Sequence, residues 1–250
     1  MDKAIIQINS LYKKYKSADD FALKDFSLLV NKGEKLGLIG PNGAGKTTLL
    51  SILFGLIKAT SGSFSINNLS YTNHKKSIKS IIGVVPQEYA LYPELTAYEN
   101  LLFFGSMYGL KGSELREKIN KYLQYLEIDY AAHKLINTFS GGMKRRINLI
   151  AGVLHNPKIL FLDEPTVGVD VHSKQLIIKF LNELNLNGTT IVYTSHHLLE
   201  AQEFCNRIAF INQGQLLAVD TPKNLIALTN NAQNMEDVFI FLSKKQVTNA

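Results

Sequence analysis

The stretch that decides the fold is GPNGAGKT, residues Gly40–Thr47, which has the spacing G-x-x-x-x-G-K-T. An apolar segment, residues 34–39, precedes it and predicts a buried strand, and residues 46–56 have helical spacing. A glycine-rich loop between a strand and a helix lets successive backbone N–H groups surround a phosphate, and the helix start adds the positive end of its dipole. The sequence therefore predicts a loop that binds phosphate groups.

Each residue type in this loop suits contact with a magnesium-bound triphosphate. Lys46 provides a cation for the outer phosphates, and the Thr47 hydroxyl is a hard oxygen ligand of the kind that Mg²⁺ prefers. The alternative is a glycine-rich turn that only caps a helix, and the strand before the loop argues against it. The predicted nucleotide-binding residues of the loop are Gly40, Pro41, Asn42, Gly43, Ala44, Gly45, Lys46, Thr47 and Thr48.

A second apolar run, ILFL at residues 159–162, ends in the acids Asp163 and Glu164. In α/β folds, ligands bind at the carboxyl edge of the buried strands, so both carboxylates are expected at that edge. We expect Asp163 to bind Mg²⁺ through water, and Glu164 to orient or deprotonate the attacking water. The alternative is that the acids only begin a polar loop, and the phosphate-binding loop upstream argues against it.

With its third motif, SGGM at Ser140–Met143, the chain resembles the nucleotide-binding domains of the ABC family over nearly its whole length. The motif matches the family signature, usually Leu-Ser-Gly-Gly-Gln, with Phe139 in place of Leu and Met143 in place of Gln. Phosphate contact needs the Ser140 hydroxyl, the N–H groups of Gly141 and Gly142 and the helix end, so neither change is expected to abolish function. Without the companion motifs, Ser140 would be interpreted as an ordinary helix N-cap.

The resemblance implies further binding residues. Tyr15 matches the aromatic residue that stacks on adenine, with Tyr12 as its rival. Gln87 matches the glutamine of the Q-loop, whose amide can touch Mg²⁺ or water. Asp170 matches the aspartate of the D-loop, although VGV at residues 167–169 departs from the family's usual Ser or Ala, then Leu, which leaves its subunit contact open.

The resemblance also implies how catalysis is divided between subunits. His196 matches the switch histidine that hydrogen-bonds the γ-phosphate, with His197 as its rival. The predicted catalytic residues are then Glu164, His196 and Gln87, and the predicted metal ligands are Thr47, Gln87 and Asp163. In the family two subunits pack head to tail, so each signature closes over ATP held by the other subunit, and hydrolysis removes the contacts that favour closure.

The order of predicted elements is α/β. Residues 4–11 and 26–30 predict strands near the start, residues 97–154 have a helical pattern, and residues 159–195 predict a strand, a helix and a strand joined by a right-handed crossover. The predicted fold is a P-loop NTPase core with a parallel sheet, an antiparallel β subdomain and an inserted helical subdomain, the ABC ATPase type. We predict an ABC ATPase domain at 1–220, its helical subdomain at about 88–155, and a short C-terminal helical tail at 221–250.

Composition supports a chain that stays in the cytosol. Its 250 residues are 46% hydrophobic, which is enough for a sizeable core. No apolar run approaches the roughly 18 residues that a membrane-spanning helix needs, and the start does not resemble a secretory leader. The single cysteine, Cys205, is interpreted as a half-buried helix residue.

The charge balance is mildly basic, with 27 Lys and Arg against 21 Asp and Glu. The basic clusters at 13–16, 75–79 and 144–146 lack the interleaved aromatic residues of a base-stacking surface. They are interpreted as solvated surface, and we expect no nucleic-acid partner.

The cargo class is a softer inference. Residues 95–101, 140–146 and 234–239 resemble exporter subunits of the drug, antibiotic and polysaccharide group. Export is therefore expected, with import or lipoprotein release as other transport outcomes. The implied partners are a separate transmembrane permease subunit and a second ATPase subunit, taken as a second copy of this chain. The implied location is the inner face of the cell membrane, reached through the permease.

Rival interpretations come from other classes. A soluble ABC ATPase that acts on the ribosome or DNA would resemble twin cassettes in one chain or carry very long coiled coils, and this sequence has one cassette and no sustained heptads. A nucleotide kinase or a GTPase would share the phosphate loop but would explain neither the signature nor the switch histidine.

Overall fold

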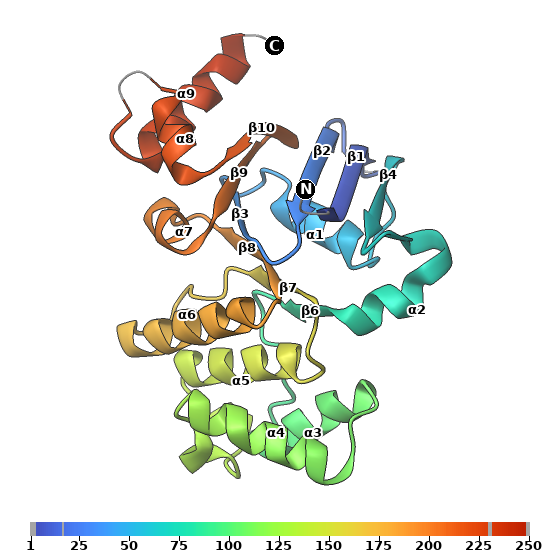
Figure 1. Cartoon of the computed structure of the whole chain (residues 1–250), viewed down its shortest axis with the longest axis vertical. Coiled ribbons are helices and arrows are strands. Elements are labelled where there is room, and N and C mark those ends of the chain that lie inside the picture. The colour runs from blue at the N-terminus through green and yellow to red at the C-terminus, as the bar shows by residue number, and fades with distance from the viewer. Residues whose placement is uncertain (1–3, 17, 230–231, 249–250) are drawn as a thin grey trace. The chain divides into compact units, whose positions relative to one another are not determined.

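The computed structural model describes residues 4–16, 18–229 and 232–248. It divides into a first unit, residues 1–79 and 190–250, and a second unit, residues 80–189 (Figure 1). The boundary at residue 220 and the subdomain at about 88–155 stay predictions.

In the described part of the first unit, the strands form an antiparallel group in the order β2-β1-β4-β5 and a mixed group in the order β10-β9-β3-β8. β3 pairs in parallel with β8 and β9, and β10 closes an antiparallel hairpin with β9. The strands are β1 (Ala4–Lys14), β2 (Phe21–Asn31), β3 (Lys35–Ile39), β4 (Ser61–Ile66), β5 (Leu69–Ser70), β8 (Thr190–Ser195), β9 (Arg207–Asn212) and β10 (Gln215–Asp220). The helices are α1 (Lys46–Leu53), α2 (Tyr71–Ile81), which ends just inside the second unit, α7 (Leu198–Phe204), α8 (Pro222–Ala227) and α9 (Met235–Thr248).

The second unit contains the parallel strands β6 and β7 and most of the helical segments that the sequence predicts. The predicted helical stretch, residues 97–154, is divided by turns into separate helices. The elements are β6 (Ile82–Val85), α3 (Ala97–Met107), α4 (Gly112–Tyr125), short 3-10 turns at Asp129–Ala131 and Ile136–Thr138, α5 (Gly141–Val153), β7 (Ile159–Asp163) and α6 (Val171–Leu186).

β1 and β2 are longer than their alternating patterns predict, because each contains a bulge. Ser10 has φ 43° and Asp25 has φ 49°, and the register between the strands shifts near both residues. A bulge adds one residue and interrupts the alternation of buried and exposed side chains while pairing continues beyond it. Gly62 of β4 fits against the Ser10 bulge, since a Cβ there would lie 2.2 Å from the Ser10 carbonyl oxygen.

α1 ends earlier than the predicted limit of residue 56. Gly55 has φ 68°, a left-handed conformation that ends helices. The Tyr71 hydroxyl donates to the Phe54 carbonyl oxygen at 2.6 Å, and a Cβ at Gly55 would overlap the Tyr71 ring. The turn after α1 is therefore fixed by contacts with α2.

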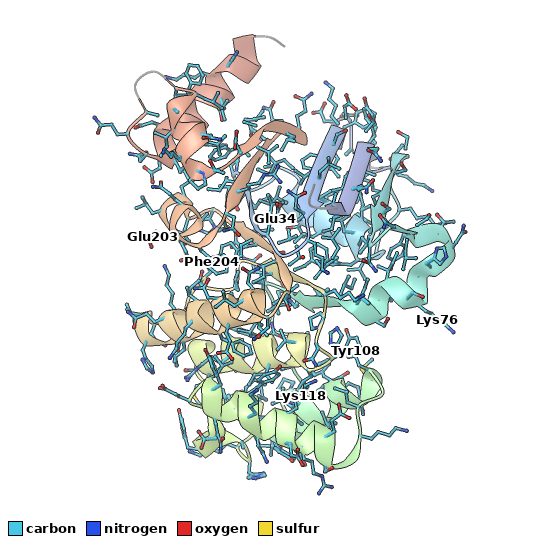
Figure 2. The ribbon with its side chains drawn as sticks, viewed as in Figure 1. Glu34, Lys76, Tyr108, Lys118, Glu203 and Phe204 are labelled. Atoms are coloured by element: carbon cyan, nitrogen blue, oxygen red, sulfur yellow. The ribbon has the colours of Figure 1, made fainter. Side chains whose placement is uncertain are left out.

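In the second unit, α5 packs closely on β6. A Cβ at Gly152 would lie 2.7 Å from Val85 Cγ2, and a Cβ at Gly83 would lie 2.3 Å from the Gly152 carbonyl oxygen. Beyond the end of α5, the His155 ring stacks on Tyr108 at 3.6 Å between centroids; Figure 2 labels Tyr108. α4 buries one face, with Leu115, Ile119 and Leu123 buried and Tyr122 half-buried.

The interpretation of Cys205 as a half-buried helix residue was wrong. Cys205 lies just after the last residue of α7 and is 6% exposed. A Cβ at Gly37 of β3 would lie 3.0 Å from the Cys205 sulfur, so the thiol fills the space beside that glycine. Burial raises the pKa of the Cys205 thiol to about 12.

Within the described residues, we find no helix that combines the length and the apolar character needed to cross a bilayer.

Candidate functional site

The phosphate loop has the backbone that its glycines predict. Gly43 and Gly45 have φ 80° and 108°, which side chains other than glycine rarely adopt. A Cβ at Gly40 would lie 2.1 Å from the Ile211 carbonyl oxygen, and a Cβ at Gly45 would lie 2.6 Å from the Ala22 carbonyl oxygen. A Cβ at Gly43 would meet nothing within 4 Å. The loop is thus fixed against β2 and β9 and leaves open space at Gly43.

The start of α1 suits an anion. Its N-cap, Gly45, makes no side-chain hydrogen bond to the helix, and the first turn contains no acidic residue. Uncapped N–H groups and the helix dipole together favour a bound phosphate. Lys46 is 6% exposed, and its Nζ donates to the carbonyl oxygens of Gly40 at 2.7 Å and Pro41 at 3.0 Å. The ammonium group therefore lies against the loop itself.

Of the rival tyrosines, Tyr15 lies beside α1. Its hydroxyl is 3.3 Å from Thr48 Oγ1, and the residue is 40% exposed, which leaves ring surface for a ligand. The Tyr12 ring instead packs edge-on against Phe21 at 5.8 Å. This geometry favours Tyr15 as the aromatic residue that contacts a base.

The histidines after β8 remain rivals. His196 and His197 are both exposed, and their ring centroids are 4.2 Å apart. The His197 N–H donates to Ser195 Oγ at 2.9 Å, and His197 occupies the N-cap position of α7 without a side-chain capping hydrogen bond. His196 immediately follows the strand.

In the second unit, the acids follow β7 as predicted. Asp163 is the half-buried last residue of the strand. Glu164 is 7% exposed with φ 49°, a strained conformation of the kind that clusters at functional sites. Gln87 Nε2 donates to Glu164 Oε2 at 3.2 Å, so the structure brings these predicted catalytic residues together.

The predicted signature and D-loop residues meet between α5 and α6. Ser140 caps α5, and its Oγ accepts from the Met143 N–H at 3.3 Å. Asp170 caps α6 by accepting from Ser173 N–H at 2.8 Å and Ser173 Oγ at 2.7 Å. These hydrogen bonds lower the pKa of the Asp170 carboxyl group. A Cβ at Gly142 would lie 2.6 Å from Ser173 Oγ, so glycine is required there.

The interpretation of residues 144–146 as solvated basic surface was wrong for Arg145 and Arg146, which are 3% and 7% exposed, whereas Lys144 is half-buried. Arg145 donates to the carbonyl oxygens of Pro86 and Gln87, each at 2.9 Å. All residues of α5 from Arg145 to Val153 are buried, so the arginines lie in a helix that is covered on all sides.

Comparison with known proteins gives the family. The sequence model of the ABC transporter family matches residues 23–167, more than half of the chain. The chain belongs to the ABC transporter family. It is 42% identical over 221 residues to the linearmycin resistance ATP-binding protein LnrL of Bacillus subtilis (strain 168), covering 88% of this chain and 70% of LnrL. It is 36% identical over 226 residues to the Nod factor export ATP-binding protein I of Burkholderia thailandensis, covering 90% of this chain and 74% of that protein.

Solved structures agree on the ABC ATPase fold. The ATP-binding subunit of an ABC transporter superposes with a TM-score of 0.88 at 24% identity, covering 96% of this chain and 99% of that one. The cassette MJ0796, a dimer in a post-hydrolysis state bound to ADP and Pi, gives 0.79 at 28% identity, covering 86% of this chain and 98% of that one. A shorter match, residues 135–201, is to an AAA domain family of the AbiEii toxin and Type IV TA systems.

Family membership confirms the predicted fold class and activity. The chain is the ATP-binding subunit of an ABC transporter and an ABC-type ATPase. Membership in this family also argues against the rival interpretations as a nucleotide kinase or a GTPase. Tyr15, the phosphate loop and His196 belong to the first unit, and Gln87, Asp163, Glu164, Ser140 to Gly142 and Asp170 belong to the second.

Proposed function

We propose that this chain hydrolyses ATP as one of a pair of cassettes that drives export through a separate transmembrane subunit. The observation that carries the proposal is the buried Glu164 carboxylate at the end of β7, held by Gln87 in a chain of the ABC transporter family. A general base must be fixed in place and kept from bulk water, and this carboxylate meets both conditions.

The phosphate loop binds the nucleotide in this proposal. Backbone N–H groups of residues 42–48, including the start of α1, bind the outer phosphates, and Lys46 moves from its loop carbonyls to those phosphates. Tyr15 stacks on adenine.

The donor set fits Mg²⁺. Thr47 and Gln87 are exposed and Asp163 is half-buried, and they supply hydroxyl, amide and carboxylate oxygens, which are hard ligands. Mg²⁺ usually combines one or two such ligands with substrate phosphates and water, and it neutralises charge on the phosphates. Thr47, Gln87 and Asp163 are the proposed ligands.

Hydrolysis is assigned to residues beside the γ-phosphate. Glu164 accepts the proton of the attacking water, and Gln87, through its amide hydrogen bond, holds that carboxylate in one orientation. His196 donates a hydrogen bond to the γ-phosphate.

The partner cassette completes each site. Ser140, Gly141 and Gly142 at the start of α5 bind the γ-phosphate held by the other subunit, and the second subunit is a second copy of this chain. Loss of the γ-phosphate removes these contacts and opens the pair. Asp170 takes part at the subunit contact.

Export and location follow from the relatives. LnrL is named for linearmycin resistance and the Burkholderia protein for Nod factor export, which supports export over import and over action on ribosomes or DNA. The chain then lies at the inner face of the membrane, bound to a permease subunit. Co-purification in mild detergent tests this: recovery of a polytopic membrane protein supports it, and recovery of ribosomes or DNA overturns it.

Glu164→Gln tests the central assignment. ATP hydrolysis should fall about a thousandfold, since general-base catalysis contributes on the order of 10²–10⁴-fold. ATP binding should persist, and the variant should form a stable ATP-dependent dimer on size-exclusion chromatography. Glu117→Gln, the same change at an exposed position of α4, is the control. A Glu164→Gln protein that turns over ATP at the wild-type rate refutes the assigned base.

A further inference from the structure

Adjacent arginines hold the signature helix α5 from different directions. Arg146 Nη1 donates to the carbonyl oxygens of Leu126 at 2.8 Å and Glu127 at 3.2 Å, beyond the end of α4. Arg145 instead reaches the segment after β6, residues 86–90, which contains Gln87 and is called the Q-segment below. Arg146 thus joins α5 to the segment just after α4, and Arg145 joins it to the Q-segment.

The contact made by Arg145 depends on the shape of its guanidinium group. Nη1 donates to the Pro86 carbonyl oxygen and Nη2 to the Gln87 carbonyl oxygen, each at 2.9 Å. A planar fork can bind both carbonyls at once, whereas a lysine ammonium cannot reproduce this geometry. Because the side chain is 3% exposed, these bonds replace solvation of the cation.

Neighbouring side chains strengthen the same connection. Asn148, one turn later on α5, donates to the Pro86 carbonyl oxygen at 3.3 Å and accepts from the Ala90 N–H at 3.4 Å. The Tyr89 ring lies 4.9 Å from the Arg145 guanidinium carbon, and its hydroxyl donates to the Gly141 carbonyl oxygen at 3.2 Å. The Q-segment is therefore attached to α5 from its first turn onward.

The connection continues to the predicted catalytic acid. Arg145 binds the main chain of Gln87, and the Gln87 side chain donates to Glu164 Oε2 at 3.2 Å. Burial lowers the pKa of Arg145 from its ordinary value, and nearby Tyr89, Asp163 and Glu164 act in the opposite direction. An arginine stays charged under these conditions, so the connection persists at neutral pH.

We propose that Arg145 is a positioning residue that couples the paired ATP sites of the dimer. The inference rests on the proposed function, in which Ser140 contacts the partner's ATP while Gln87 and Glu164 act on ATP bound by their own chain. Arg145 joins the helix that begins at Ser140 to the main chain of Gln87. Closure of the signature over one ATP therefore orients Gln87 and Glu164 for the other ATP.

The test compares two substitutions in α5, each of which removes one positive charge. Arg145→Gln removes the fork, and Lys144→Gln removes the neighbouring half-buried cation, whose side chain makes no hydrogen bond or ion pair with residues 4–16, 18–229 or 232–248. Phosphate release by the purified full chain is followed against ATP concentration with Mg²⁺. Wild type should show a Hill coefficient between about 1 and about 2, the limit set by paired sites. Arg145→Gln should reduce it to about 1 and lower kcat about tenfold with little change in KM. Lys144→Gln should match wild type.

A second variant separates coupling from folding. Tyr89→Phe keeps the ring beside Arg145 and loses only the hydroxyl contact with Gly141, so the Hill coefficient should fall partway. Circular dichroism and thermal melting establish that each variant is folded. A folded Arg145→Gln protein with the wild-type Hill coefficient and kcat overturns the coupling. So does a wild-type enzyme that hydrolyses ATP without cooperativity.

Failure of the proposed function would give a different experimental result from failure of the coupling role. If Glu164→Gln neither stops hydrolysis nor pairs in ATP, the assigned base and the dimer are wrong, whatever Arg145 does. If Glu164→Gln behaves as expected and Arg145→Gln is unaltered in kcat and cooperativity, only the coupling role is lost.

Discussion

The phosphate loop of the first unit and the signature helix of the second are built in different ways. The Lys46 side chain makes local contacts, with carbonyls five and six residues earlier, and the glycines supply the required backbone, while Gly40 and Gly45 also pack against β9 and β2. The start of α5 instead depends on distant segments, since Gly142 packs on Ser173 and Arg145 bonds to the Q-segment 58 and 59 residues earlier. A site whose ligand contacts come from adjacent residues can bind its ligand alone. A site built from distant segments, such as the start of α5, can change when those segments change.

The largest effect that separates these regions is expected for Lys46→Ala. The variant loses charge-assisted hydrogen bonds to phosphate, which are worth about 1.5–3 kcal/mol each, so ATP affinity should fall about a hundredfold. Equilibrium binding of a fluorescent ATP analogue measures the change, and Lys32→Ala, an exposed lysine of the same unit, is the control. Unchanged affinity in Lys46→Ala would remove its role.

A double variant sharpens the comparison. Lys46→Ala acts on binding and Arg145→Gln on turnover, and the residues share no described contact. Their effects on kcat/KM should therefore multiply, as they do for independent sites. If the effect of the double variant on kcat/KM differs greatly from the product of the single effects, the phosphate loop also depends on the start of α5.

Gly142→Ala should disturb the start of α5 and leave the phosphate loop unaffected. The added Cβ would lie 2.6 Å from Ser173 Oγ and 2.7 Å from Asp170 Oδ2, and Ser173 is 1% exposed with little room to move. Overpacking of this kind costs about 1–3 kcal/mol, which predicts a tenfold to hundredfold weaker ATP-dependent dimer in the Glu164→Gln background.

Sedimentation measures the dimer, and binding of nucleotide to the single chain should stay unchanged. Met143→Gln, which restores the usual family residue on the same helix, is the control and should alter dimerisation by no more than about twofold. Equal dimerisation of Gly142→Ala and Met143→Gln would contradict the packing argument.

The same contrast explains what could be predicted from the sequence. The phosphate loop and β7 with its acids were predictable because the information lies in adjacent residues. The lengths of β1 and β2 were not, since the bulges at Ser10 and Asp25 break the alternation on which the prediction depends. Both strands extend beyond their bulges because the pairing between β1 and β2 continues there, and the sequence of one strand alone does not encode that pairing.

The burial of Arg145 and Arg146 was also not predicted from the sequence. Arg145 and Arg146 were assigned to the surface because they are charged, yet acceptors from residues 86, 87, 126 and 127 allow their burial. Those acceptors are main-chain carbonyls, which any residue type provides. The residue types at those positions therefore contain no sign of the contact.

The smallest expected effect concerns the stability of the second unit rather than ligand binding. It involves His155, which lies just beyond the end of α5. His155 Nε2 lies 2.9 Å from the Ile82 carbonyl oxygen at the start of β6, and its ring stacks on Tyr108. Burial lowers the pKa of His155 below its ordinary 6.5, the charge of Lys118 acts in the same direction, and the Ile82 contact opposes them. The folded chain therefore holds this proton less tightly than the unfolded chain does.

Stability should consequently depend on pH in a definite direction. Well above pH 6.5, His155 is neutral in both states and does not change the free energy of unfolding. As the pH falls through 6.5, the unfolded chain binds the proton first and the free energy of unfolding decreases. Between about pH 7.5 and about pH 5.5, Tm should fall on the order of a few °C more in wild type than in His155→Gln. Parallel melting curves for the two proteins would contradict this. ATP affinity should not follow the titration, because the phosphate loop and the strands that support it belong to the first unit and His155 belongs to the second.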